Sequence, residues 1–197
     1  IDVDLEEFIK AAAGVYEKQF GKKLDCKEVS AFVKQREENY FKDKGNDYDI
    51  LNAVIKRPGV NILDDFAKIK ILSEARKKGG FDSLVFALSR VNNIIPKEFS
   101  PGEVKESLFE AEEEKKLYKK FMDSGEKTDK LLKNRDFSGA FEAISGFKPE
   151  IDAFFDKVLV ISDNTDVKNN RLSLLHLINE TVRSFADFSA IVIDRKQ

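Results

Sequence analysis

Apolar residues recur at intervals of three and four along nearly the whole chain, a spacing that places side chains on one face of an α-helix. Residues 5–20 show this pattern clearly and are followed by Gly21, a common helix stop. Either Asn61 or Asp64 can cap a later helix, because its side chain can accept from free backbone amides. The pattern predicts four more helices in the first half, at about 27–44, 48–56, 61–78 and 82–95.

The second half shows the same helical spacing. It predicts helices at about 110–122, 130–134, 137–144, from Pro149 onward, and at 168–192. The polar stretch 123–129 is expected to separate the first two. Residues 158–161, Val-Leu-Val-Ile, are rich in β-branched side chains and suit either a short strand or a continuation of the Pro149 helix. Continuation is favoured because no pairing strand is nearby, so the chain is predicted to be all-α.

Two of the four prolines fall in residues 96–102, which marks the best domain boundary in the chain. We therefore expect a helical appendage at 1–99 and an α-helical bundle at 100–197. The chain begins at Ile1 rather than Met, and we interpret it as a fragment of a longer protein.

The sequence predicts an intracellular protein without a membrane span. No apolar run approaches the roughly 18 residues that cross a bilayer, and no signal peptide is visible. Cys26 is the only cysteine and His176 the only histidine, so neither a disulfide framework nor a structural zinc site is expected. This composition suits the reducing cytoplasm, with Cys26 as a buried, inert thiol.

Catalytic motifs are missing from the sequence. Gly79-Gly80 lacks the strand and helix context of a phosphate loop, and His176 lies within an apolar helical segment. The carboxylates of 112–114 are more simply a solvated helix start than an acid–base pair or a magnesium site. We therefore expect binding rather than chemistry, with no metal or cofactor in this chain, and a free-standing hydrolase is disfavoured.

Charge and aromatic content do not indicate a nucleic-acid binder by themselves. Residues 1–99 hold 18 Lys and Arg against 17 Asp and Glu, and residues 100–197 hold 16 against 19. Any RNA site must therefore be a local basic face. The 17 Phe could stack on bases if exposed, but their helical spacing places at least ~80% of them in the core.

Three stretches resemble the end of the bacterial glycyl-tRNA synthetase beta subunit. In residues 151–191, a segment similar to the family's Ile/Val-Asp-x-Phe-Phe-Asp-x-Val-x-Val precedes an Asn-Arg-Leu-x-Leu-Leu helix that closes in Ala-Asp-Phe-Ser. Residues 89–94 are similar to the family's Lys-Arg-Val-x-Asn-Ile, with Ser89 in place of the Lys, and residues 108–118 to its Leu-Phe-x-x-x-x-Glu-x-x-Leu-Tyr. The matched motif residues include Phe154, Phe155, Asp156, Asp187 and Phe188.

The resemblance implies a helical appendage followed by an anticodon-binding bundle of the DALR type. Residues 186–189 read Ala-Asp-Phe-Ser instead of the name-giving motif, which favours glycyl over arginyl enzymes. The family implies a tetramer of two alpha and two beta subunits. Its alpha subunits hold the class II site that uses glycine, ATP and Mg²⁺, while this end of beta docks the anticodon of tRNA-Gly. DNA is not an expected partner.

Polar side chains near helix ends are the candidate tRNA contacts. A helix N-terminus with amide and cationic side chains can hold a phosphate or a base edge, and a basic helix end can reach a backbone phosphate. The candidates are Lys168, Asn170 and Arg171 at the last helix, Arg90, Asn92 and Asn93 at the end of the fifth, and Arg76.

Each candidate also has a structural reading. Asn169 or Asn170 can cap the last helix, Arg171 can pair with Asp156 or Asp163, and Arg90 can satisfy terminal carbonyls. The three motif phenylalanines are assigned to the core. Overall the sequence predicts a noncatalytic, anticodon-recognising portion of a glycine-tRNA ligase. The alternative is a structural module that holds the synthetase subunits together without direct anticodon contact.

Overall fold

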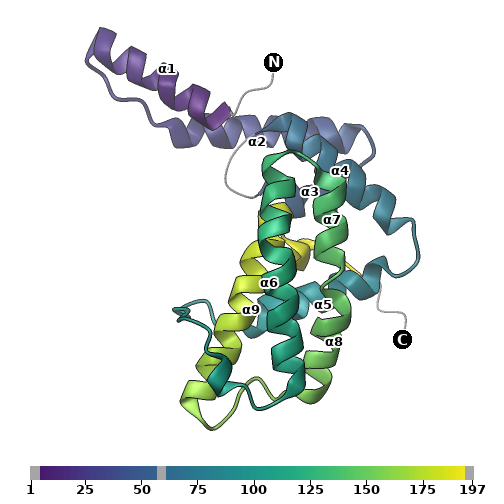
Figure 1. Cartoon of the computed structure of the whole chain (residues 1–197). Coiled ribbons are helices and arrows are strands. Elements are labelled where there is room, and N and C mark those ends of the chain that lie inside the picture. Colours follow the sequence, from purple (N-terminus) through teal and green to yellow (C-terminus); the bar gives the residue numbers. More distant parts are fainter. Residues whose placement is uncertain (1–4, 57–60, 194–197) are drawn as a thin grey trace.

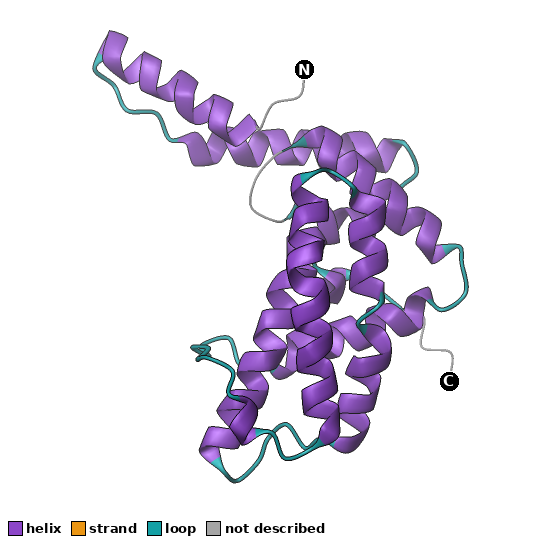
Figure 2. Cartoon of the chain, in the orientation of Figure 1, coloured by secondary structure: helices purple, strands orange, loops and turns teal. Residues whose placement is uncertain are grey.

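The computed structural model describes residues 5–56 and 61–193, and every regular element within these ranges is a helix (Figures 1 and 2). The predicted all-α fold is therefore confirmed. The α-helices in chain order are α1 Leu5–Phe20, α2 Cys26–Asp43, α3 Tyr48–Ile55, α4 Ile62–Arg76, α5 Phe81–Ile94, α6 Glu112–Lys133, α7 Phe137–Ser145, α8 Lys148–Lys157 and α9 Thr165–Phe185. Two short 3-10 helices are η1 Glu106–Leu108 and η2 Phe188–Ala190.

The first five helices begin and end within two residues of the predicted positions, because local signals mark their ends. The Asp25 carboxylate accepts from the backbone N–H of Lys27 at 2.8 Å and caps α2. Asn61, one of the two predicted caps of α4, accepts from the backbone N–H of Asp64 at 3.3 Å. The predicted break at 57–59 lies outside the described residues.

Helix α6 is continuous where the sequence predicted a break at 123–129. The charged residues of this stretch face solvent, whereas Gly125 and Thr128 are buried at helical spacing. The Thr128 hydroxyl donates to the Ser124 carbonyl at 2.8 Å, and Glu126 pairs with Lys130 one turn later. The break prediction was wrong because high polarity was taken for a loop although the inward positions keep helical spacing.

Residues 158–161 form neither of the two predicted structures. Helix α8 ends at Lys157, and the following residues alternate, with Val158 and Val160 buried and Leu159 and Ile161 exposed. Alternation is typical of extended chain, but no strand pairs with it among the described residues. The segment instead runs as irregular chain to α9.

Helix α9 starts and ends earlier than predicted. Asn164 caps it, accepting from the backbone N–H of Asp166 at 3.0 Å, so the predicted cap at Asn169 or Asn170 is wrong. The helix ends at Phe185, because Ala186 adopts an extended, buried conformation. After this point Phe188 and Ala190 of η2, and Ile191 and Ile193 beyond it, pack against the core, whereas Val192 is exposed.

A hydrophobic core extends from Phe41 in α2 to Ile191 after η2. Helix α6 packs along α7, α8 and α9, while α5 packs against α8, α9 and η2 (Figure 1). Helices on both sides of residues 96–102 therefore contribute to this core. The division into 1–99 and 100–197 stays a prediction.

Helices α1 and α2 form a hairpin that projects from the rest of the molecule (Figure 1). Helix α1 has no buried residue. Five of the 17 phenylalanines are exposed, so fewer lie in the core than predicted. The exposed ones are Phe8, Phe20, Phe32, Phe66 and Phe86.

Candidate nucleic-acid interface

Arg171 is 5% exposed and lies between α9 and the start of α6. Its Nε donates to Glu114 Oε1 at 2.8 Å, and a terminal nitrogen donates to Glu110 Oε2 at 2.8 Å. Its other terminal nitrogen donates to the Leu159 carbonyl at 3.1 Å. Burial opposes the positive charge, but the hydrogen bonds, led by that to Glu114, hold the pKa of Arg171 above its usual value. Its donors therefore tie α9 to α6.

The partner of this guanidinium, Glu114, is fully buried at the start of α6. Its carboxylate also accepts from the backbone N–H groups of Glu110 at 2.8 Å and Ala111 at 2.7 Å. It thus satisfies amides at the helix N-terminus as well as the arginine. The structural partners suggested by the sequence, Asp156 and Asp163, are not the ones found.

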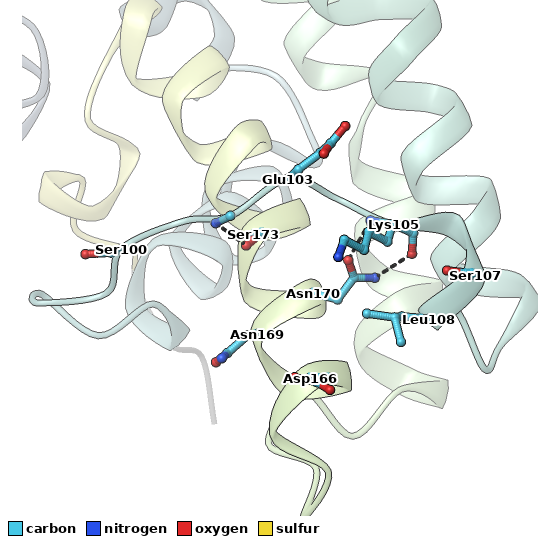
Figure 3. Close-up of a pocket in the computed structure, with 10 residues that line it drawn as sticks. Ser100, Glu103, Lys105, Ser107, Leu108, Asp166, Asn169, Asn170 and Ser173 are labelled. Carbon is cyan, nitrogen blue, oxygen red and sulfur yellow. Dashed lines mark hydrogen bonds between the residues drawn. The ribbon is translucent and has the colours of Figure 1, made fainter.

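Asn170 fastens a connecting segment onto α9 (Figure 3). Its Oδ1 accepts from the backbone N–H of Lys105 at 2.7 Å, and its Nδ2 donates to the carbonyl of the same residue at 3.0 Å. One turn further along α9, the Ser173 hydroxyl accepts from the backbone N–H of Gly102 at 3.0 Å. The adjoining hollow of about 480 Å³ is also lined by two acidic residues, Glu103 and Asp166, against one basic residue, Lys105. These carboxylates disfavour an RNA phosphate there.

Arg76 ends α4 in an acidic setting. It makes two hydrogen bonds to the Asp49 carboxylate, at 2.9 and 2.6 Å, and one to Asp47 at 2.7 Å. Asp49 also accepts from the backbone N–H of Val192 at 2.7 Å. Burial opposes the charge on Asp49, yet hydrogen bonds from Arg76 and from the backbone hold its pKa below the usual value. The cluster joins α3, α4 and the chain after η2.

Arg90 has a different environment. Its guanidinium lies 4.2 Å from the ring centroid of Phe155 in α8 and 5.6 Å from that of Phe86, one turn earlier in α5. Within residues 5–56 and 61–193, this guanidinium meets no carboxylate and no hydrogen-bond acceptor. The side chain is partly exposed, so its donors remain available to a ligand.

Arg90 lines a hollow of about 460 Å³, which we call the Arg90 pocket. Three elements converge there, since its polar and aromatic lining is Phe86, Ser89, Arg90 and Asn93 from α5, Phe155 from α8 and Ser189 from η2. The Ser89 hydroxyl donates to the Phe188 carbonyl at 3.1 Å and so holds η2 against α5. Phe86 is 44% exposed at the rim.

A second hollow, of about 540 Å³, adjoins the first because both include Asn93. We call it the Arg183 pocket, and its polar side chains include Asn93, Lys97, His176, Asn179, Glu180 and Arg183. At its base, Asn179 Nδ2 donates to Asn92 Oδ1 at 3.3 Å. Among the described residues that line them, the two pockets together offer three cations against one carboxylate, and Arg183 also lies 3.9 Å from Asp187.

The seven candidate contacts predicted from the sequence do not form one positive surface. They fall into three groups, which are Arg90, Asn92 and Asn93 at the end of α5, Lys168, Asn170 and Arg171 in the first turns of α9, and Arg76 at the end of α4. The two paired arginines have separate acidic partners, and Lys168 is half-buried. Whether any of the seven contacts RNA stays a prediction.

Four residues around these pockets were not among the RNA contacts predicted from the sequence. Phe86 was not singled out among the phenylalanines, although its spacing of four from Arg90 suggests a contact on one helix face. His176, Glu180 and Arg183 also follow helical spacing, which interrupts the apolar stripe of α9 with a polar one. That polar stripe was the available signal.

The motif residues divide between the core and the surface. Phe154 and Phe188 are buried as predicted, whereas Phe155 is partly exposed beside Arg90. Asp156 is exposed. Asp187 caps η2 by accepting from the backbone N–H of Ser189 at 3.1 Å.

Three further predictions concern metal binding, the single cysteine and membrane spans. Within residues 5–56 and 61–193, no group of three or more His, Cys, Asp or Glu could hold a metal ion. Cys26 is partly exposed, contrary to the buried position predicted for it, and its thiol contacts the Leu24 carbonyl at 3.9 Å. None of the helices in these ranges has both the length and the apolar character needed to cross a bilayer.

The fold and the matching residues define the class of protein. Residues 84–188, more than half of the chain, match the model of the DALR anticodon binding domain. The chain therefore belongs to the DALR anticodon-binding domain family. The match begins in α5 and ends in η2, so it includes both pockets' helices.

Curated relatives narrow this class to one enzyme subunit. The glycine–tRNA ligase beta subunit of Sulfurihydrogenibium sp. is 36% identical over 171 residues, which is 87% of this chain and 25% of that protein. Its counterpart in Clostridioides difficile is 30% identical over 193 residues, or 98% of this chain and 28% of that protein. The chain is thus homologous to part of the glycine–tRNA ligase beta subunit and spans about a quarter of these relatives' length.

Proposed function

We propose that this chain binds the anticodon region of tRNA-Gly as a noncatalytic portion of a glycine–tRNA ligase beta subunit. The observation that carries the proposal is the family match over 84–188, together with homology to beta subunits along most of the chain. A cytoplasmic location follows from the proposal.

The charge distribution is compatible with a confined RNA site. The chain has a net charge of −2, so nonspecific attraction to phosphate is weak across the whole molecule. The Arg90 and Arg183 pockets have an excess of cations, and they lie together at the end of α5. We therefore assign the RNA-facing surface to these two pockets rather than to the start of α9.

The proposal places the chemistry of aminoacylation outside this chain. Glycine activation would use ATP and Mg²⁺ bound by the alpha subunit, in a complex of two alpha and two beta subunits. This chain would position tRNA-Gly so that its acceptor end reaches that site. Binding energy far from the reacting atoms can favour the reaction in this way, because it fixes the substrate's orientation.

A direct test compares tRNA-Gly with a second tRNA and with tRNA-Gly that carries the second tRNA's anticodon. Binding to this chain is measured by fluorescence anisotropy at several salt concentrations. Tighter binding of tRNA-Gly, lost when the anticodon is exchanged, is expected. Equal affinity for all three RNAs would contradict anticodon recognition.

A second candidate function is to hold the synthetase subunits together. The α1–α2 hairpin favours it, because Phe8 is 61%, Val15 64% and Phe32 56% exposed. Such large apolar side chains on a projecting hairpin are typical of protein contact surfaces. Serine substitutions at these three positions in the intact subunit would then dissociate the complex, as measured by sedimentation velocity, without changing the affinity of this chain for tRNA.

A further inference from the structure

We infer that the Arg90 pocket receives one unpaired nucleotide, whose base stacks on Phe86 while its acceptor edge pairs with the Arg90 guanidinium. This inference deepens the proposed function, on which it rests, by naming the residues and the chemistry of recognition. The ligand is a base edge with two neighbouring acceptors. Guanine O6 and N7 form such an edge, as do cytosine O2 and N3.

The first argument is the orientation of Arg90. A guanidinium 4.2 Å from the Phe155 ring centroid is held by cation–π attraction, which immobilises it before a ligand arrives. Its fork of N–H donors has no acceptor within the described part of the chain. Arginine is a donor only, so the complementary group must bring acceptors.

The second argument is the aromatic rim. Phe86 is 44% exposed in the middle of a helix that is otherwise packed against α8, α9 and η2. Its ring lies within 5.6 Å of the same guanidinium. An exposed ring beside unpaired donors allows a base to stack and to hydrogen-bond at once, as is common for bases of single-stranded RNA. A phosphate alone would make no use of the ring.

The third argument is electrostatic. Among the described residues, the lining of the Arg90 pocket has one cation and no carboxylate. The hollow at Asn170 has two carboxylates and one cation, Lys105, and the hollow at Arg76 is lined by three carboxylates, those of Asp47, Asp49 and Asp82. A neighbouring phosphate is tolerated there, because Lys97 and Arg183 line the adjoining pocket. The Asn93 side chain, shared by both pockets, supplies an amide that can both donate and accept.

The test uses the whole chain and tRNA-Gly anticodon stem-loops with every single-base substitution in the loop. Phe86→Ala removes the stacking ring from an exposed helical position, and affinity is expected to fall roughly 5- to 150-fold. Arg90→Lys keeps the positive charge but loses the fork. This variant is expected to lower the affinity for the tRNA-Gly loop about tenfold or more and to remove the preference for one base at one loop position. The salt dependence of binding should be nearly unchanged.

Arg36→Ala provides the matched control. Arg36 also lies over a phenylalanine, with its guanidinium 5.2 Å from the Phe32 ring centroid, but it belongs to the α1–α2 hairpin. This variant is expected to bind every loop as the unchanged chain does. Circular dichroism melting of each variant verifies that it folds.

Three outcomes would overturn the inference. One is that Arg90→Lys and Phe86→Ala bind every loop as tightly as the unchanged chain does. Another is that Arg90→Lys weakens binding to every loop equally, which would indicate a phosphate contact or a purely structural arginine. The third is loss of binding in Arg36→Ala as well. If the unchanged chain and the variants all prefer the tRNA-Gly loop over the substituted loops, only this inference fails. If the unchanged chain binds all loops equally, the proposed function fails.

Discussion

Buried charges decide much of the stability of this chain at the residue scale. The Arg171–Glu114 pair is removed from solvent, and each group also bonds to backbone at a helix end or loop. Such a pair contributes little compared with an apolar pair, but removing one partner is costly, because the other charge stays buried without compensation. Glu37 represents the opposite case, a buried carboxyl that has no hydrogen-bond partner among the described residues.

Arg171→Ala is expected to lower the free energy of unfolding by about 3 to 5 kcal/mol, because it leaves Glu114 buried and unpaired. Urea denaturation followed by circular dichroism measures the change. Arg183→Ala on the same helix is the control. The Arg183 side chain is 50% exposed and lies 3.9 Å from Asp187, and an exposed ion pair at this distance contributes less than about 1 kcal/mol. Equal effects of the two variants would contradict a structural role for Arg171.

Glu37 makes stability depend on pH near neutrality. Burial, and secondarily the negative charge of Asp65, raises the pKa of Glu37 from 4.5 to about 7, while Lys34 lowers it. The folded chain thus holds a proton that the unfolded chain has lost. Its contribution to stability is full below pH 4.5 and is lost as the pH rises through 7.

Glu37→Gln is therefore expected to stabilise the chain at pH 8.5, by at most ~3 kcal/mol, and to have little effect at pH 4.5. Urea denaturation at the two pH values measures this. The neighbouring Glu38→Gln is the control and should leave the pH profile unchanged. A Glu37→Gln effect that does not grow with pH would contradict the assignment.

The continuity of α6 is the main result at the element scale. The helix extends over 22 residues, and it contacts α7, α8 and α9. Its charges follow the helix dipole, with Glu112 to Glu114 in the first turn and Lys130 and Lys133 in the last. A break at 123–129 would remove the rigid element against which these three helices pack.

Lys127→Pro is expected to destabilise the chain by about 3 kcal/mol or more. Proline removes a backbone donor inside α6 and clashes with the preceding turn. Lys127→Ala, at the same exposed position, should be neutral within about 0.5 kcal/mol. Thermal melts measure the difference, with a lower midpoint expected for Lys127→Pro than for Lys127→Ala. Similar midpoints would mean that the helix is interrupted there.

At the scale of the whole molecule, a nearly neutral chain is proposed to bind a polyanion through a small basic region. In the part of the chain that the structure describes, only Arg90, Lys97 and Arg183 supply positive charge to the two pockets. The binding constant for tRNA should then depend weakly on salt, with a slope of roughly −2 in a plot of log K against log salt concentration. Anisotropy titrations between low and moderate salt measure this slope.

A steeper slope would show that further cations take part. Lys168 is then the first to test, because it is partly exposed at the start of α9 and lies outside both pockets. Lys168→Ala would reduce the slope by about one if its ammonium contacts a phosphate. An unchanged slope would exclude that contact.

The sequence by itself determined the helical fold and the family. Helix positions follow from apolar spacing and from caps such as Asp25 and Asn61, which act over a few residues and are readable in a linear pattern. The motifs of 151–191 likewise appear as ordered letters. Where these local signals were weak, the secondary structure predicted from the sequence was wrong, as at 123–129 and 158–161.

Only the tertiary structure decided what the polar side chains do. Arg171 meets Glu114, which lies 57 positions away in the chain, and Arg90 meets Phe155 in another helix. Two arginines with similar local sequence settings thus have opposite roles, one internally paired and one whose donors meet no acceptor within the described residues. Periodicity cannot distinguish them, because the energy of an ion pair or a stacked ring depends on which helix faces lie together, and that is settled by packing of the whole core.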